Sequence, residues 1–338
     1  MKAAEAGDRK RVETGGSKSV IFVAFACNLG IAVAKFLAAF WTQSSAMLSE
    51  AIHSLVDTSN QLLLLLGISR GNLPPDAQHP FGHGKEIYFW SFIVAMVLFS
   101  LGAGVAIYEG IEKVLHPQPL QHVFVLYVVL LVAMTLEGYS TVKAVGEFNR
   151  RRQSSGQGFI TALRASKDPT LFAIVLEDLA AMVGLTIALL GTMAAHLGGY
   201  DWADGVASIL IGCVLAFVAI FMSSEIRSLI VGEAASHPVQ TGIRKIIEAE
   251  TGADKPIRKI NEIRTMHLGP QDILVTASVD FDDWVSARTV EDVTARLQKA
   301  IKSRYPDVHN LFIEVQSEQT FAASKNASQI QVVGSAAH

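Results

Sequence analysis

The chain has 338 residues, of which 50% are hydrophobic and 17% are charged, and its mean hydropathy is +0.35. Ordinary soluble proteins carry about 25% charged residues, so this composition excludes a protein made only of water-exposed domains. The apolar composition leads us to expect a lipid bilayer as a partner. The net charge of −3 is small and no nucleic-acid-binding motif is evident, so we expect no nucleic acid partner.

Apolar runs of about 20 residues, each long enough to cross a bilayer, recur along the first 230 residues. They predict six transmembrane helices within residues 19–233, after a cytoplasmic N-terminal segment, 1–18. Lys and Arg are absent from the loops at one end of the runs and gather at the other, which predicts that both termini are cytoplasmic. The six runs are Val20–Trp41, Ser45–Ile68, Tyr88–Leu115, Val123–Val145, Leu171–Ala195 and Trp202–Ile230.

The pattern changes after Ile230, where apolar runs give way to short periodic segments. Their order, helix–strand–strand–helix–strand over residues 234–318, predicts a small cytoplasmic α+β domain of ferredoxin-like or metallochaperone-like type. Residues 319–338 are small and polar, which predicts a disordered tail. The predicted segments are Pro238–Thr251, Ile257–Thr265, Ile273–Asp280, Thr289–Arg304 and Asn310–Val315.

Ionisable residues lie inside two of the apolar runs. Glu50, His53 and Asp57 are spaced by three and four residues in the second run, so they share one helical face. A charged group in hydrocarbon costs about 2.5–3.5 kcal/mol on insertion scales, so such groups usually mark an ion path. Glu177 and Asp178 lie in the fifth run, at a similar depth. An imidazole with carboxylates suits Zn²⁺ best, and Mn²⁺, Fe²⁺ or Co²⁺ less well; hydrogen-bonded helix packing is the alternative.

Glu137, in the fourth run, is a further intramembrane acid. It is either an access-path carboxylate or proton site, or the partner of Lys35 of the first run in a structural ion pair. The residue types alone do not separate these two interpretations.

The loop between the second and third runs combines one acid with two histidines. Asp76, His79 and His83 fall within eight residues of each other, and Pro80 and Gly82 allow the chain to bend between them. Three such ligands suit a second metal site. Solvated loop histidines are the alternative interpretation.

These features together resemble the cation diffusion facilitator family of divalent-metal transporters, and the likeness extends to about Gln316. It rests on the segment from Ser44 to Asp57, on the loop motif from His79 to Lys85, and on six spans before an α+β domain. The resemblance implies a homodimer that exchanges cytoplasmic metal, usually Zn²⁺, for protons by alternating access. Within the family, the chain looks like the subgroup that contains the mitochondrial zinc exporter.

The resemblance also implies roles for individual residues. His53 and Asp57 match the family's transport ligands on the second helix, and Asp178 matches its Asp on the fifth. Asp76, His79 and His83 match a loop metal site of some members. One position departs from the family, because Ile174 stands where a His or Asp usually precedes the fifth-helix Asp by four residues. Glu177 or Glu50 would then supply the fourth ligand.

We therefore predict a proton-coupled antiporter that exports Zn²⁺ from the cytoplasm, in the inner or plasma membrane if the source is bacterial. Zn²⁺ is the expected substrate, with Mn²⁺, Fe²⁺, Co²⁺ and Cd²⁺ as possible substrates, and protons are the counter-ion. A Mn²⁺ or Fe²⁺ exporter is one alternative, and a non-transporting membrane metal sensor or scaffold is another. We do not expect an enzyme, because no nucleophile or general base accompanies the ligands.

Overall fold

The computed structural model describes residues 15–42, 45–117, 122–152, 158–159, 163 and 167–325. The chain divides into two compact units. The helical unit comprises the chain up to Leu73 and from Lys85 to Ser228. The sheet unit comprises the chain from Leu229 onward together with the loop Pro74–Gly84, which the sequence had placed within the transmembrane domain.

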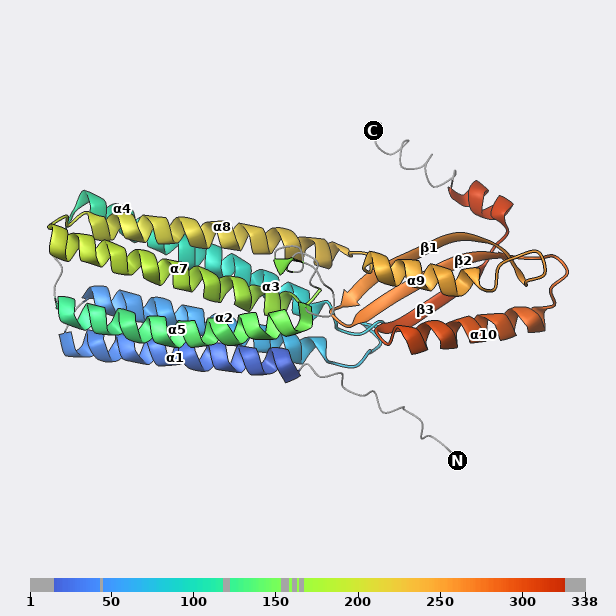
Figure 1. The fold of residues 1–338 in the computed structure, drawn as a ribbon, viewed down its shortest axis with the longest axis horizontal. Helices are drawn as coiled ribbons and strands as arrows, with labels where there is room; N and C mark the ends of the chain where they lie inside the picture. The colour runs from blue at the N-terminus through green and yellow to red at the C-terminus, as the bar shows by residue number, and fades with distance from the viewer. Residues whose placement is uncertain are drawn as a thin grey trace, which may run out of the picture. The chain divides into compact units, whose positions relative to one another are not determined.

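Long helices that lie side by side make up the helical unit (Figure 1). Helix α1 packs along α2 and α5, α5 also packs along α7, and α2 packs along α3. The α3–η1–α4 segment is one continuous element whose middle, η1, is π-helical. The bounds are α1 Gly15–Thr42, α2 Ser45–Gly71, α3 Glu86–Val97, η1 Leu98–Gly104, α4 Val105–Leu115, α5 Val123–Arg152, α7 Pro169–Gly198 and α8 Ala203–Val231.

Five of the described helical segments are long and apolar enough to cross a membrane. The second predicted span, α2, has 27 residues but is not among the five. Its length is sufficient, but its polar and ionisable residues, among them Asp57, Asn60 and Gln61, lower its hydropathy. The expectation of six apolar spans therefore holds for five within the described residues. Those five are Ser19–Trp41, Glu86–Leu115, Val123–Arg150, Pro169–Gly198 and Ala203–Val231.

Helix α7 has defined ends, and these set the position of its two acids. The Asp168 side chain accepts hydrogen bonds from the backbone N–H groups of Thr170 and Leu171, and Pro169 occupies the first turn. Both features favour a helix start at this point. The helix ends at Gly199, whose φ of 70° is the left-handed conformation typical of a C-cap.

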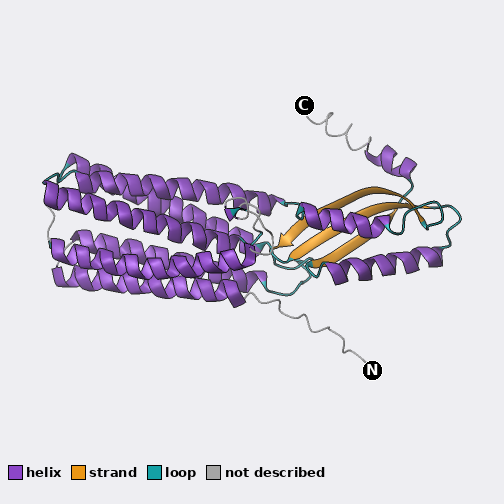
Figure 2. Ribbon diagram, in the orientation of Figure 1, coloured by secondary structure: helices purple, strands orange, loops and turns teal. Residues whose placement is uncertain are grey.

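The sheet unit contains the predicted helix–strand–strand–helix–strand order (Figure 2). Strand β2 pairs antiparallel with β1 and parallel with β3, so the sheet order is β1-β2-β3. The likeness to a ferredoxin-like fold stays a prediction. The bounds are α9 His237–Glu248, β1 Ile257–Gly269, β2 Asp272–Phe281, α10 Ala287–Arg304 and β3 Val308–Val315.

One apolar core joins the two helices to the sheet in this unit. Ile243 and Ile247 of α9 are spaced by four residues and are fully buried, as are Val275 and Val279 of β2, which share one sheet face. Helix α10 contributes buried residues at the same four-residue spacing, beginning with Val293. The periodicities read from the sequence are thus those of the buried faces.

The predicted tail differs from the structure at its start. Residues 318–325 are helical, so the expectation that disorder begins at residue 319 was wrong for this stretch. Ser317 begins the helix, because its hydroxyl accepts a hydrogen bond from the Thr320 N–H, as an N-cap does. Residues 326–338, like 1–14, lie outside the described residues.

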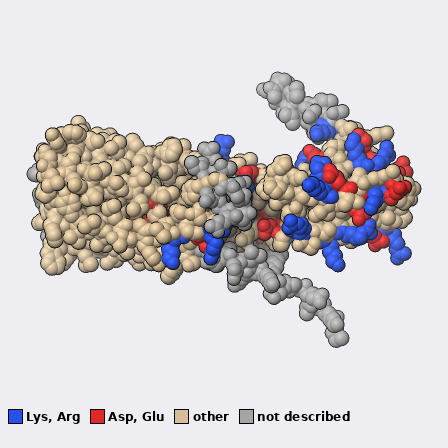
Figure 3. Space-filling model, in the orientation of Figure 1, with Lys and Arg blue, Asp and Glu red and all other residues tan. Residues whose placement is uncertain are grey.

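The surfaces of the two units differ in charge. On the face drawn in Figure 3, long stretches of the helical unit show no Lys, Arg, Asp or Glu, whereas the sheet unit carries many side chains of both signs. Exposed apolar side chains such as Phe22, Leu37, Phe124 and Phe217 cover the helices instead. This contrast is what a bilayer-embedded unit and a water-exposed unit require.

Candidate metal sites

The two adjacent acids of α7 contact different helices. Glu177 and Asp178 are both buried, with 7% and 1% of their surfaces exposed. Oε1 of Glu177 accepts a hydrogen bond from Nδ2 of Asn60 on α2 at 3.1 Å. Oδ2 of Asp178 accepts one from Oγ of Ser140 on α5 at 2.7 Å. Because neighbouring helical positions diverge by about 100°, one acid faces α2 while the other faces α5.

Two further acids complete the group. Glu137 of α5 is buried, and its carboxyl group interacts electrostatically with Asp178 and with Asp57 of α2. Glu177 interacts electrostatically with Asp57, Asp178 and Glu137. We call Asp57, Glu137, Glu177 and Asp178 the acid cluster. Four acids from three helices inside an apolar bundle attract a cation strongly when they are ionised, because charges in such surroundings require a compensating partner.

The remaining predicted members of this site are only partly described. Glu50 and His53 belong to α2, but their side chains lie outside the described residues. His53 stands one turn before Asp57 and therefore on the same helical face. Ile174 on α7, the position that departs from the family, is fully buried. The roles of Glu50 and His53 stay predictions.

Glu137 lies near Lys35, the ion-pair partner considered from the sequence, while its role as an access-path carboxylate or proton site stays a prediction. It interacts electrostatically with the acids Asp178 and Asp57 and also with Lys35 of α1. Its Oε2 atom is buried and accepts no hydrogen bond from the described residues. The carboxyl group therefore belongs to the acid cluster while it lies near a compensating cation, so the two interpretations are compatible.

The sequence interpretation missed Asn60 and Ser140. Asn60 follows Asp57 by three residues, and Ser140 follows Glu137 by three, so each lies on the acid-bearing face of its own helix. A polar residue at that spacing from an intramembrane acid was the available signal. Each donates its hydrogen bond to an acid of α7. The sequence alone does not show which helices meet, so these contacts could not be predicted from it.

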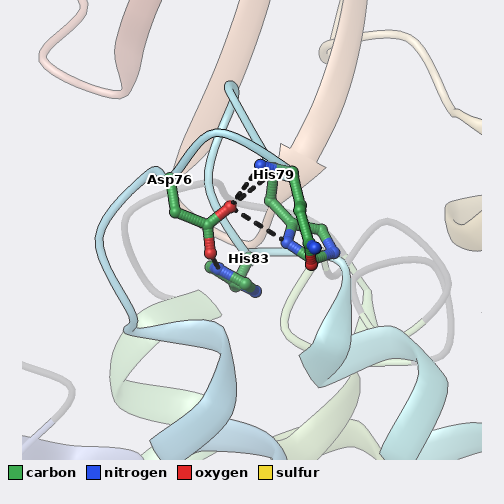
Figure 4. Close-up of polar contacts among 4 residues, drawn as sticks. Asp76, His79 and His83 are labelled. Carbon is green, nitrogen blue, oxygen red and sulfur yellow. Dashed lines mark hydrogen bonds and ion pairs between the residues drawn. The ribbon is translucent and has the colours of Figure 1, made fainter.

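The loop site consists of Asp76, His79 and His83, and all three side chains converge (Figure 4). Oδ1 of Asp76 lies 3.3 Å from Nδ1 of His79, and Oδ2 lies 3.1 Å from Nε2 of His83. One ligand atom from each residue lies within 4.8 Å of the other two. Among the described residues, no other group of three His, Cys, Asp or Glu meets this criterion.

Backbone contacts fix the acid of the loop site. Oδ1 of Asp76 accepts hydrogen bonds from the N–H groups of His79 at 2.6 Å and Gln78 at 2.8 Å. The His79 N–H bond is the main cause that lowers the pKa of Asp76 to about 2, with smaller contributions from Gln78 and the two imidazoles. The carboxylate is therefore ionised at neutral pH, as a metal ligand must be. One carboxylate and two imidazoles suit Zn²⁺.

The loop is packed against the sheet of its own unit. The Phe81 ring meets the Phe312 ring of β3 edge to face, with centroids 6.4 Å apart. Gly84 lies against the end of β1, where a Cβ atom would stand 2.5 Å from the carbonyl oxygen of Leu268. Only glycine allows this approach, so the sequence of the loop is matched to the sheet.

A known protein family matches the part of the chain that forms the long helices. The sequence profile of the cation efflux transmembrane domain matches residues 21–231. The chain belongs to the cation efflux family. Members of this family are transporters and not enzymes, and the five apolar helices among the described residues are those of a multi-pass membrane protein. The family expected from the sequence is thereby confirmed.

Three relatives of this cation efflux protein are informative. Human "Proton-coupled zinc antiporter SLC30A9, mitochondrial" is 32% identical over 301 residues, which cover 88% of this chain and 52% of the relative. Metal tolerance protein C4 of Arabidopsis thaliana is 30% identical over 276 residues, covering 81% and 59%. The manganese efflux system protein MneP of Bacillus subtilis is 24% identical over 305 residues, covering 88% and 95%. The chain thus spans about half the length of the mitochondrial relative.

Proposed function

We propose that this cation efflux protein is a proton-coupled antiporter that exports Zn²⁺ from the cytoplasm by alternating access. The observation that carries the proposal is the acid cluster, which α2, α5 and α7 assemble inside an apolar bundle. The human relative, named a proton-coupled zinc antiporter, supports the choice of substrate and counter-ion.

Proton coupling follows from competition at one site. Carboxylates and the imidazole of His53 bind a divalent cation only when they are unprotonated, so metal binding displaces protons. An imidazole exchanges its proton near neutral pH, which makes His53 the natural member for this exchange. A site that releases metal on the far side and takes up protons there completes the antiport cycle.

The membrane arrangement is part of the proposal. Helix α2 acts as the sixth span, because it packs along α1 and α3, both of which are apolar spans. Its polar face is then covered by protein, which is where intramembrane ionisable groups are tolerated. The distribution of Lys and Arg supports a cytoplasmic position for both termini. The sheet unit supports a homodimer, and the loop site holds a second metal ion.

A manganese exporter is the second candidate. The described part of the transport site is rich in oxygen ligands, which Mn²⁺ favours more than Zn²⁺ does. The Bacillus subtilis relative is named for manganese efflux. The sensor or scaffold alternative rested on Ile174. The contact of Glu177 with Asn60 of α2 argues against it, because it supports Glu177 as the acid that stands in for this position.

Transport by purified protein in liposomes tests the proposal. We expect Zn²⁺ flux with opposite proton flux, and a loss of about 100-fold or more in Zn²⁺ flux in Asp57→Asn, as for loss of a metal ligand. Asp204→Asn is the matched control, because Asp204 of α8 pairs with Lys113 of α4 at 2.9 Å and not with the acid cluster. Unchanged flux in Asp57→Asn would contradict the site, and Mn²⁺ flux without Zn²⁺ flux would select the second candidate.

A further inference from the structure

Asn60 is an uncharged residue in the wall of the acid cluster. It follows Asp57 by three residues on the same face of α2, and its side chain is fully buried. Its Nδ2 atom donates to Oε1 of Glu177 at 3.1 Å. When Glu177 is ionised, as a metal ligand must be, its carboxylate only accepts, so the donating amide nitrogen is the end of Asn60 that meets it. The amide oxygen Oδ1 is left for another partner.

That oxygen accepts no hydrogen bond from the part of the chain that the structure describes. Buried side-chain oxygens nearly always have a partner, because an unsatisfied one destabilises the fold. Gln61, the next residue, provides a contrast. It is also fully buried, and with its amide oriented so that donors meet acceptors, its oxygen accepts from Nδ2 of Asn28 at 3.1 Å. Of two adjacent buried amides, only Gln61 has its oxygen satisfied by the described residues.

The surroundings of Asn60 indicate which kind of partner its oxygen would take. Glu177, which it contacts, interacts electrostatically with the other three acids of the cluster. A divalent cation held by these carboxylates would lie beside the amide. Amide oxygens are regular ligands of hard divalent cations, and they neutralise none of the site's negative charge.

We infer that Asn60 is a ligand of the transported cation, which Oδ1 coordinates while the Nδ2 contact to Glu177 orients the amide. This inference rests on the proposed function, because it requires the acid cluster to be the transport site. A further oxygen ligand shifts the preference of the site toward Mn²⁺ relative to Zn²⁺, which favours nitrogen and sulfur. Asn60 is therefore a specificity-determining residue of α2.

Competition between metals in the full-length protein in liposomes tests the role of Asn60. In Asn60→Ala we expect the KM for Mn²⁺ to rise about tenfold or more and the KM for Zn²⁺ to rise by less, as for loss of one contact in a metal site. Asn60→Asp keeps an oxygen at this position, so its KM for Mn²⁺ should stay below that of Asn60→Ala. Gln61→Ala is the matched control, because it removes a buried amide that faces α1 instead.

Three outcomes would overturn the inference: equal factors for both metals in Asn60→Ala, the same change of metal preference in Gln61→Ala, or no advantage of Asn60→Asp. Calorimetric titration of purified Asn60→Ala and Asn60→Asp with Mn²⁺ alone gives a second readout that does not need transport. Asp57→Asn separates the two hypotheses. If Asp57→Asn abolishes transport while Asn60→Ala leaves metal preference unchanged, the inference fails and the proposed function stands.

Discussion

The acid cluster and the loop site are built in opposite ways. The loop site draws its three ligands from eight consecutive residues, its acid is exposed, and backbone N–H groups hold that acid in place. The acid cluster draws its four acids from three helices; Glu137, Glu177 and Asp178 are buried and Asp57 is partly buried, and side chains of neighbouring helices hold two of the four. A local site keeps its geometry when helices move, whereas a site shared between helices changes with their packing.

This difference in construction predicts different functions for the two sites. Alternating access requires a site whose affinity changes as helices rearrange, because release on the far side must follow binding on the near side. The acid cluster meets this requirement, since its members lie on α2, α5 and α7. The loop site does not meet it and is suited to constant binding. The comparison therefore predicts that changes in the cluster affect flux, while changes in the loop affect bound metal.

The largest effect is expected in the cluster. Asp178→Asn keeps the shape of the side chain but removes a charge from the group that Ser140 and Glu137 face. We expect Zn²⁺ flux in liposomes to fall about 100-fold or more, as for removal of a ligand. Glu86→Gln is the control, because Glu86 accepts a hydrogen bond from Trp90 instead. Flux near the wild-type level in Asp178→Asn would remove the distinction between the two sites.

An intermediate effect is expected in the loop. His83→Ala removes one of three ligands, so the affinity for the loop metal should fall about 10–100-fold, while flux should fall by less than the loss seen in Asp178→Asn. Calorimetric Zn²⁺ titration and liposome flux on the same preparation measure both quantities. The control is His237→Ala, since that histidine on α9 lies beside Thr241 and not in the loop site. A loss of flux as large as in Asp178→Asn would make the loop part of the transport path.

The smallest effect concerns the charge of Asp76. Its pKa is lowered to about 2, chiefly by the His79 N–H, so its folded pKa lies below that of an unfolded chain. The stabilisation from the charged carboxylate is therefore complete at neutral pH and is lost only as the pH falls through the folded value. Carboxyl NMR of metal-free protein labelled at Asp should show Asp76 still ionised at pH 4. A midpoint near about 3.9, the ordinary Asp value, would show that the backbone bonds do not form.

The sequence predicted those features that depend on local pattern. The order of helices and strands follows from apolar periodicity, and the convergence of Asp76, His79 and His83 follows from their closeness along the chain. The helix at residues 318–325 was missed, because one short polar turn looks like a disordered tail. In α2 the same polar residues that indicate a site also lower the hydropathy of the helix, so they count against α2 as an apolar span.

Features that depend on which elements meet could not be predicted. Adjacent acids on one helix diverge, but only the packing of α7 against its neighbours decides that Glu177 meets Asn60 and that Asp178 meets Ser140. The contact of Gly84 with the end of β1 joins positions far apart in sequence. No local sequence pattern therefore predicts that the loop belongs to the sheet unit. Tertiary packing decided these points.

The most direct test of the account locates the transported ion itself. Anomalous scattering at the zinc edge should be measured on metal-bound protein in which Asp76→Asn and His83→Ala weaken the loop site. The account predicts a Zn²⁺ ion among α2, α5 and α7, with carboxylate oxygens of the acid cluster at about 2.0–2.2 Å. A variant that still transports Zn²⁺ but shows no ion among these helices, or an ion bound elsewhere in the helical unit, would contradict it.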